Sequence, residues 1–311
     1  MKRLITILLL GISSSLSAQH IEGSPEYIRN LTAKWDGERF ENGRPKVPDN
    51  LIERLKKVTL EEAWAELMKL GYQNQFEGDW SLLHETEDAV LCGRVVTAQF
   101  MPMRPDLEDA IIEQGKKEGR MWEQKRTVSW VINSLVKGDV YVADTYNKEW
   151  LGTAIGSNLG TGVFNATGNG MITYGHIRDI ERLQKVEGFN VWCKGFDPSY
   201  MRQTMLVNYN VPVRIGKAIA LPGDVVLAKR EGVLFIPPHL VDHIVLTSEF
   251  TSLTDEFGEE MIKRGIYTAG QIDSAWSEEM NERFVKWVRS YSGTLPMTKS
   301  QLESCLKERN F

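Results

Sequence analysis

Cysteine is scarce in this chain, at three among 311 residues. That count excludes a disulfide-rich scaffold, and the spacing of Cys92, Cys193 and Cys305 matches no metal-binding motif. Basic blocks are also absent, and 42 Asp and Glu outnumber 37 Lys and Arg. A protein that coats nucleic acid needs a concentrated positive surface, so we expect no nucleic-acid partner.

Long hydrophobic runs are missing apart from a short one at the N-terminus. A basic start at residues 1–3 precedes an apolar run at 4–12 and mostly small residues at 13–18. This pattern is typical of a secretory signal peptide, and the run is too short to cross a membrane. We predict a signal peptide over residues 1–18, cleaved after Ala18. The mature protein is then exported, periplasmic or secreted, and has no membrane span.

Apolar residues make up 42% of the chain and charged residues 25%, which is ordinary for a globular protein. A capping box of Thr59 and Glu62 predicts a helix that ends at Gly71. Further patterns predict a helix at 127–135, a helical, charged C-terminus of about 70 residues, and strands at 89–100, 139–143, 171–173, 189–193 and within 211–236. Strands and helices that alternate in this way indicate one mixed α/β core with helical additions at both ends.

Several familiar motifs fail on inspection. Gly160 and Gly162 resemble a dinucleotide-binding loop, but Asn165 stands where its third glycine belongs. The chain has no G-x-S-x-G nucleophile elbow. His239 and His243 would share a helix face and could hold zinc, but a third ligand is missing.

One glycine-rich region is more informative. It contains Gly156-Ser157-Asn158-Leu159-Gly160-Thr161, then Thr167-Gly168-Asn169-Gly170, then Gly175-His176-Ile177-Arg178-Asp179. An Arg-Asp pair in such a loop is often a structural salt bridge. Here it occurs with Leu91-Cys92-Gly93-Arg94-Val95-Val96-Thr97, Gly138-Asp139-Val140 and Pro222-Gly223-Asp224-Val225-Val226.

In order and spacing, these segments resemble the family of 4-hydroxy-4-methyl-2-oxoglutarate aldolase and the regulator of ribonuclease activity A (RraA), from about residue 47 to 245. Flanking pieces such as Trp35-Asp36-Gly37-Glu38-Arg39-Phe40 resemble a longer subgroup. The resemblance implies an α/β, RraA-like swivelling β/β/α domain at 87–248. An N-terminal arm with helices at 19–86 and a C-terminal helical extension at 249–311 would flank it. It also implies a homotrimer or hexamer, with active sites between subunits.

The resemblance further implies divalent-metal chemistry on a small 2-oxo acid. Asp179 would anchor Mg²⁺ or Mn²⁺, partly through water. Arg178 would grip the substrate carboxylate with its planar guanidinium group. Backbone amides from Gly156, Ser157, Asn158 and Leu159 would hold the rest of the pyruvate unit, and the metal would stabilise the developing enolate.

Two departures from the family pattern affect this expectation. Ser157 stands where aldolase members carry an acidic residue, and Tyr174 stands where the family often has Asp. His176 also replaces a small residue. In one interpretation the substrate has changed, and Ser157, Tyr174 and His176 join Arg178 as catalytic groups.

Two functional hypotheses follow from the resemblance and from these departures. The first is an exported, metal-dependent lyase of the pyruvate aldolase or oxaloacetate decarboxylase type. The alternative is a catalytically degenerate, non-enzymatic binding protein that keeps the fold, because the loss of a site acid removes a route for proton transfer. A third function, regulation of a cytoplasmic ribonuclease, conflicts with the predicted signal peptide.

Overall fold

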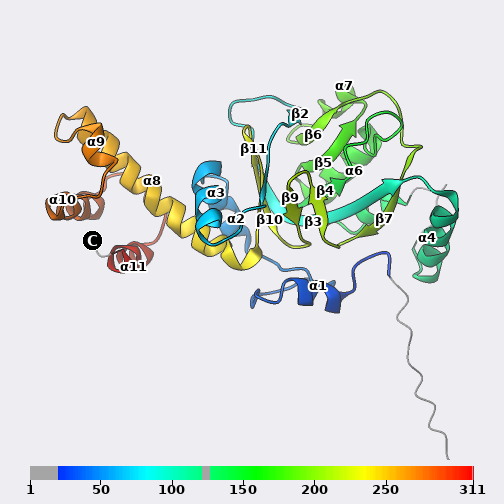
Figure 1. The fold of residues 1–311 in the computed structure, drawn as a ribbon, viewed down its shortest axis with the longest axis horizontal. Helices are drawn as coiled ribbons and strands as arrows, with labels where there is room; N and C mark the ends of the chain where they lie inside the picture. The colour runs from blue at the N-terminus through cyan, green and yellow to red at the C-terminus, as the bar shows by residue number, and fades with distance from the viewer. Residues whose placement is uncertain (1–19, 121–126, 310) are drawn as a thin grey trace, which may run out of the picture.

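The computed structural model describes residues 20–120, 127–309 and 311, so the predicted signal peptide lies outside the described residues. A large mixed sheet occupies the right-hand part of the molecule in Figure 1, with strand order β1-β11-β10-β3-β4-β5-β6-β2 and β7 paired to β3. Its strands are β1 (Phe76–Glu77), β2 (Ser81–Leu82), β3 (Leu91–Pro102), β4 (Asp139–Asp144), β5 (Met171–Ile177), β6 (Val191–Phe196), β7 (Thr204–Tyr209), β10 (Val225–Lys229) and β11 (Gly232–Ile236).

Strands β3, β4, β5 and β6 are parallel, and both faces of this part of the sheet are covered. In β4, Tyr141 and Ala143 face one apolar cluster, while Val140 and Val142 face another. Helices α5 (Val128–Ile132) and α6 (Ser157–Thr167) contribute to the first cluster, and the hairpin of β8 (Val213–Ile215) and β9 (Ala218–Ala220) contributes to the second. Burial on both faces explains why these strands are nearly continuous apolar runs in the sequence.

The N-terminal arm crosses the lower edge of the sheet in Figure 1 with α1 (Pro25–Leu31) and leads to α2 (Asp49–Leu55) and α3 (Leu60–Lys69). The predicted capping box of Thr59 and Glu62 begins α3 and is confirmed. Arg44 of the arm enters the core, where its two terminal nitrogens each donate to a carboxylate oxygen of Asp139 at 3.0 Å. The arm is therefore fixed to the start of β4.

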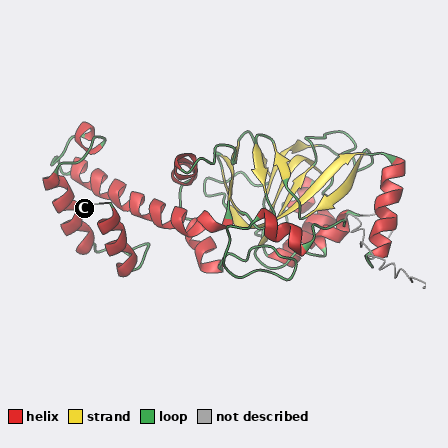
Figure 2. Ribbon diagram, turned by 60° about the horizontal axis from the view of Figure 1, so that its bottom comes forward, coloured by secondary structure: helices red, strands yellow, loops and turns green. Residues whose placement is uncertain are grey.

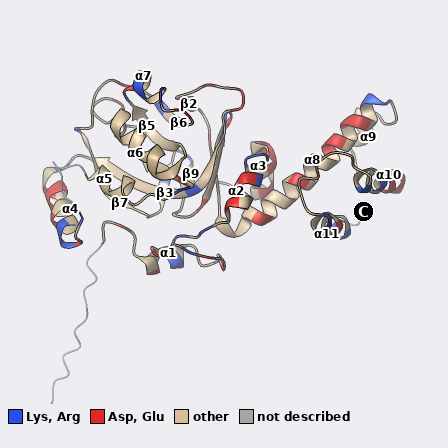
Figure 3. Ribbon diagram, turned by 180° about the vertical axis from the view of Figure 1, so that it is seen from behind, with Lys and Arg blue, Asp and Glu red and all other residues tan. Residues whose placement is uncertain are grey.

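The C-terminal extension is built on α8 (Val241–Lys263), a helix of 23 residues that leaves the sheet region and reaches away from it (Figures 1 and 2). Helices α9 (Ala269–Ile272), α10 (Glu278–Arg289) and α11 (Lys299–Glu308) gather around its far end. Phe250, Phe257 and Phe284 lie at the centre of their own apolar cluster. Acidic residues recur along α8, as the red segments of its ribbon in Figure 3 show. None of the helices in the described residues is both long and apolar enough to cross a bilayer.

The prediction of a mixed α/β core with helical additions at both ends is confirmed. The boundaries predicted at residues 87 and 248 stay predictions, although β1 and β2 precede the first, and α8 continues across the second. No sequence pattern had indicated α4 (Pro105–Lys117) or α7 (Ile180–Leu183). The glycine-rich segment at 152–170 contains α6, which glycine content concealed because glycine is a poor helix former.

Candidate active site at the N-terminus of α6

The Arg178-Asp179 loop and the start of α6 are held together by backbone contacts. Ile155 and Ile177 form a parallel bridge, and the N–H of Arg178 donates to the carbonyl of Ile155 at 3.1 Å. Asp179 follows in a left-handed conformation, with φ of 62°. Few non-glycine residues adopt this conformation, and such residues often occur at functional sites. The turn places the Asp179 carboxylate at the first turn of α6.

The carboxylate of Asp179 makes three polar contacts. Its Oδ2 accepts the backbone N–H of Ser157 at 3.0 Å and the hydroxyl of the same residue at 3.2 Å. Its Oδ1 accepts from the guanidinium of Arg178 at 3.3 Å. The N–H of Ser157, and after it the Arg178 charge, lower the pKa of Asp179, so the group is an anion at neutral pH. Both side chains remain about one-third exposed, at 36% for Arg178 and 30% for Asp179.

Gly156 sits immediately before α6 and leaves room for these two side chains. A Cβ atom at this position would lie 2.6 Å from Oδ2 of Asp179 and 3.0 Å from Cζ of Arg178. A methyl group would therefore displace the charged groups of the site. The need for glycine here is steric, because the φ of −133° is open to any residue.

We predict that Gly156→Ala disturbs the site without unfolding the protein. The new methyl group should push apart Asp179 and Arg178, which are flexible and partly exposed, whereas the backbone tolerates alanine. The thermal unfolding midpoint should change little, while the affinity for Mn²⁺ or Mg²⁺, measured by calorimetry, should fall at least tenfold. Gly162→Ala, within α6, is a matched control, since its Cβ would make only a 3.4 Å contact with Ile132. Equal metal affinity in Gly156→Ala and wild type would contradict the prediction.

A cleft of about 440 Å³ opens beside the Arg178-Asp179 pair. Because Ile177 of β5 pairs with Phe196 of β6, the residues that follow both strands meet here. Arg182, Phe196 and Asp197 line the cleft together with the pair. The sequence analysis missed these three residues. Arg182 lies four residues after Arg178, in α7, but only the pairing of β5 with β6 brings in Phe196 and Asp197.

The predicted site residues do not all converge. Arg178, Asp179, Gly156 and Ser157 lie together, as described above. Asn158 and Leu159 occupy the first turn of α6, where the Asn158 side chain is exposed and Leu159 packs against the core. Tyr174 and His176 belong to the preceding strand β5 and make other contacts.

Tyr174 packs on the sheet face opposite α6. Its ring makes an edge contact with Trp80 at a centroid distance of 6.2 Å, and the ammonium of Lys194 lies 5.2 Å from the ring centre. Burial is the main cause that raises the pKa of its phenol, followed by the charge of Glu77. With a raised pKa the phenol keeps its proton at neutral pH and cannot accept another there. No hydrogen bond or ring contact joins Tyr174 to Arg178 or Asp179 within the described residues.

His176 lies against Gly195, where a Cβ would come within 2.5 Å of Nε2 of the imidazole. Its Nδ1 is buried without a hydrogen-bond partner in the described part of the chain. The imidazole is near enough to Asp197 to lower the pKa of that carboxyl, after two hydrogen bonds from Ser199. His176 is therefore close to Asp197, which lines the cleft, but does not line the cleft itself. Its catalytic role stays a prediction.

The two histidines considered for zinc have other partners. Nε2 of His239 lies 3.3 Å from the hydroxyl of Tyr72, and Nε2 of His243 lies 2.9 Å from Glu66. Within residues 20–120, 127–309 and 311, no three His, Cys, Asp or Glu side chains form a group that could hold a metal. A metal at Asp179 would therefore depend on water and substrate for its other ligands.

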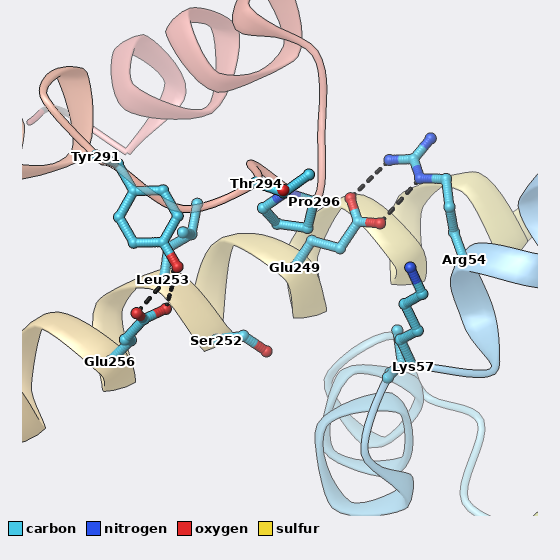
Figure 4. A pocket seen from close by; sticks show the side chains of 10 residues that line it. Arg54, Lys57, Glu249, Ser252, Leu253, Glu256, Tyr291, Thr294 and Pro296 are labelled. Atoms are coloured by element: carbon cyan, nitrogen blue, oxygen red, sulfur yellow. Dashed lines mark hydrogen bonds and ion pairs between the residues drawn. The ribbon is translucent and has the colours of Figure 1, made fainter.

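A second pocket lies where α2, α8 and the segment after α10 meet (Figure 4). The guanidinium of Arg54 donates to both carboxylate oxygens of Glu249, at 2.8 and 2.6 Å. The hydroxyl of Tyr291 donates to Glu256 at 2.7 Å. Because these groups satisfy one another, we interpret the pocket as a junction between the core and the C-terminal helices.

Comparison with known proteins identifies the family of this chain. Residues 56–235 match the family model "RraA-like: Aldolase/RraA". A "Putative 4-hydroxy-4-methyl-2-oxoglutarate aldolase" of Halalkalibacterium halodurans is 29% identical over 130 residues, which are 42% of this chain and 60% of that protein. The chain thus spans less than two thirds of this curated relative.

Solved structures share the fold. The crystal structure of Streptomyces coelicolor RraAS2, described as an unusual member of the RNase ES inhibitor RraA protein family, is 27% identical and has a TM-score of 0.59; the match covers 71% of this chain and 99% of that one. An uncharacterized protein from Pseudomonas syringae pv. tomato has a TM-score of 0.57 at 17% identity, with 74% and 100% covered.

Proposed function

Because this chain belongs to the RraA-like (Aldolase/RraA) family, we propose that it is an exported, divalent-metal-dependent lyase that acts on a small 2-oxo acid. The observation that carries the proposal is the Asp179 carboxylate, which is anchored by the first turn of α6 beside the Arg178 guanidinium. The name of the Halalkalibacterium halodurans relative supports an aldolase type of reaction. We also propose a homotrimer or hexamer, and export through the predicted signal peptide, as parts of this function.

Two groups suit the carboxylate of a 2-oxo acid. The planar guanidinium of Arg178 can form two parallel hydrogen bonds to a carboxylate. The N–H groups of Asn158 and Leu159 stand in the first turn of α6, where a helix provides no acceptor of its own, so they are available to a bound anion. Substrate held at both places would lie beside Asp179.

The donor set fits a hard divalent cation. Asp179 is ionised and partly exposed, and Mg²⁺ is commonly bound by one or two carboxylates with several waters. When bound, such an ion supplies a Lewis acid that stabilises negative charge on the 2-oxo oxygen. The hydrogen bonds from Ser157 would hold the carboxylate in place for it.

Proton transfer is where this site departs from an aldolase. Retro-aldol cleavage needs a base to take the proton of the substrate hydroxyl, whereas decarboxylation of a 2-oxo diacid releases carbon dioxide without that step. Ser157 is a neutral hydroxyl and a poor base at pH 7. Its hydroxyl is also engaged with Asp179. We therefore propose that decarboxylation is the stronger activity of this protein.

Pyruvate release tests this choice of reaction. With Mg²⁺ or Mn²⁺, wild type should release pyruvate faster from oxaloacetate than from an aldol substrate. Ser157→Asp should raise the aldol activity, by up to about 10²–10⁴-fold if the new carboxylate acts as the base. Ser157→Ala is the matched control, because the backbone N–H to Asp179 remains and no base is added.

Two outcomes would argue against this proposal. Wild type that cleaves the aldol substrate faster than it decarboxylates would show that another group takes the proton, with His176 the first residue to replace. No pyruvate from either substrate, with intact metal binding at Asp179, would favour the binding protein without turnover.

A further inference from the structure

A pocket of about 330 Å³ lies between the N-terminal arm and the open end of the β10–β11 hairpin. It shares no lining residue with the cleft beside Arg178 and Asp179. The turn that follows α1 forms one wall, and residues 221–224 and 237–239 form the other. Leu31, Leu221, Pro237 and Pro238 make much of the lining apolar. The volume falls at the lower end of the range for small-molecule sites, which is about 300–1,000 Å³.

Asp224 brings a buried carboxyl group to this pocket. Val225 pairs with Ile236 across the hairpin, so Asp224 lies opposite Pro237 at the pocket wall. Only 2% of the residue is exposed. Its Oδ2 accepts the N–H of Leu221 at 2.8 Å, but its Oδ1 has no hydrogen-bond partner within the described part of the chain. A buried oxygen without a partner is costly, and a bound donor would remove that cost.

The neighbouring polar groups do not supply the missing partner. The hydroxyl of Tyr72 and Nε2 of His239 lie 3.3 Å apart and satisfy each other. Lys34 lines the pocket from the arm, but its side chain is exposed to solvent. Arg44, also on the arm, is paired with Asp139. The pocket therefore combines one unpaired acid, two aromatic rings and an apolar wall.

We propose that this pocket binds a small organic ammonium ligand, whose N–H group pairs with Oδ1 of Asp224. The hydrocarbon part of the ligand would lie against Leu31 and the two prolines. The rings of Tyr72 and His239, with centroids 6.3 Å apart, add an aromatic side wall, and aromatic faces attract cations. This site is independent of the reaction proposed above.

Binding of a cation in this pocket is coupled to loss of the proton from the Asp224 carboxyl group. Burial raises the pKa of Asp224 to about 8, so at pH 7 the carboxyl group is mostly protonated. An ammonium ligand favours the carboxylate, and the displaced proton leaves to solvent as the ion pair forms. At pH 9 the carboxylate is already ionised and an alkylammonium still keeps its proton. Affinity should therefore rise about tenfold between pH 7 and pH 9.

His239 also faces the pocket, but its titration does not account for a rise in affinity between pH 7 and pH 9. Burial and the charge of Lys34 lower the pKa of His239, so this imidazole is neutral from pH 7 upward. Tyr72 and Lys34 are the other titratable groups that line the pocket.

Calorimetric titration of the full mature chain with butylammonium chloride tests the proposal. Wild type should bind in the millimolar range and release close to one proton at pH 7, measured by comparing two buffers with different ionisation enthalpies. At pH 9, binding should release almost no proton. Asp224→Asn should bind at least tenfold more weakly and show no proton release.

Two further variants keep the test informative if Asp224→Asn folds poorly. Ala33→Phe places a large ring at the exposed rim of the pocket and leaves the Asp224 carboxyl group in the protein, and it should also weaken binding at least tenfold. Lys34→Ala removes a positive charge at the mouth and should tighten binding of butylammonium. Weaker binding in Lys34→Ala, a preference for butyrate over butylammonium, or no butylammonium binding to wild type would overturn the proposal.

Discussion

Replacement of Asp179 with alanine is expected to lower metal-dependent pyruvate release from oxaloacetate by at least about 10²–10³-fold. The carboxylate is the anion that the first turn of α6 positions beside Arg178, and its loss removes the proposed anchor for the divalent cation. The fold should survive, because the side chain is partly exposed and its contacts are local. Activity assays with Mg²⁺ and Mn²⁺, together with circular dichroism, measure both expectations.

Metal binding provides a readout that does not depend on turnover. Calorimetric titration with Mn²⁺ should give one site in wild type and none in Asp179→Ala. Asp106→Ala is a matched control, since Asp106 also contacts a nearby arginine, Arg104, but lies on an exposed surface. Asp179→Ala with undiminished metal binding would place the ion elsewhere and remove the main support for the proposed lyase.

Arg44→Met should produce the largest loss of stability, about 3–5 kcal/mol in the free energy of unfolding. Arg44 and Asp139 are 1% and 0% exposed, and two hydrogen bonds of 3.0 Å join them. Methionine roughly fills the space but leaves the Asp139 carboxylate buried without its counter-charge. Urea denaturation of the full chain, followed by tryptophan fluorescence, measures the change.

A double variant separates lost pairing from lost packing. Arg44→Met combined with Asp139→Asn removes the unpaired charge, while the side-chain amide oxygen introduced by the second substitution can still accept the N–H of Val136, as Asp139 does. The double variant should therefore recover most of the lost stability. Arg104→Met, at an exposed ion pair, should leave stability unchanged. A double variant no more stable than Arg44→Met would attribute the loss to packing of the arm.

The pairing of Arg44 with Asp139 illustrates what can and cannot be predicted from the sequence. The family resemblance implied an N-terminal arm beside the core, but it did not identify which residue pairs with Arg44. Asp139 is 95 residues further along the chain. Only the folded backbone decides which of the many acidic residues receives a buried guanidinium.

In the candidate site, too, some features could be predicted from the sequence and others could not. The motif that contains Gly156, Arg178 and Asp179 could be recognised because its residues have fixed local roles: a glycine without Cβ, a planar cation and an adjacent carboxylate. The surroundings of Tyr174 and His176 could not be predicted in the same way. Strand residues alternate between faces, and a register irregularity in the pairing of β5 with β6 falls between Thr173 and His176. Tyr174 consequently faces Trp80 and Lys194.

The sequence by itself determined the family resemblance, the mixed α/β class, the added helices and the Arg178-Asp179 pair, because local patterns and short motifs encode these features. Tertiary structure alone decided that Ser157 donates a hydrogen bond to Asp179 and that Phe196 and Asp197 line the cleft. It also decided that Asp224 lines a pocket together with residues of the arm. The physical reason is that strand pairing and helix packing join residues whose separation along the chain carries no local signal.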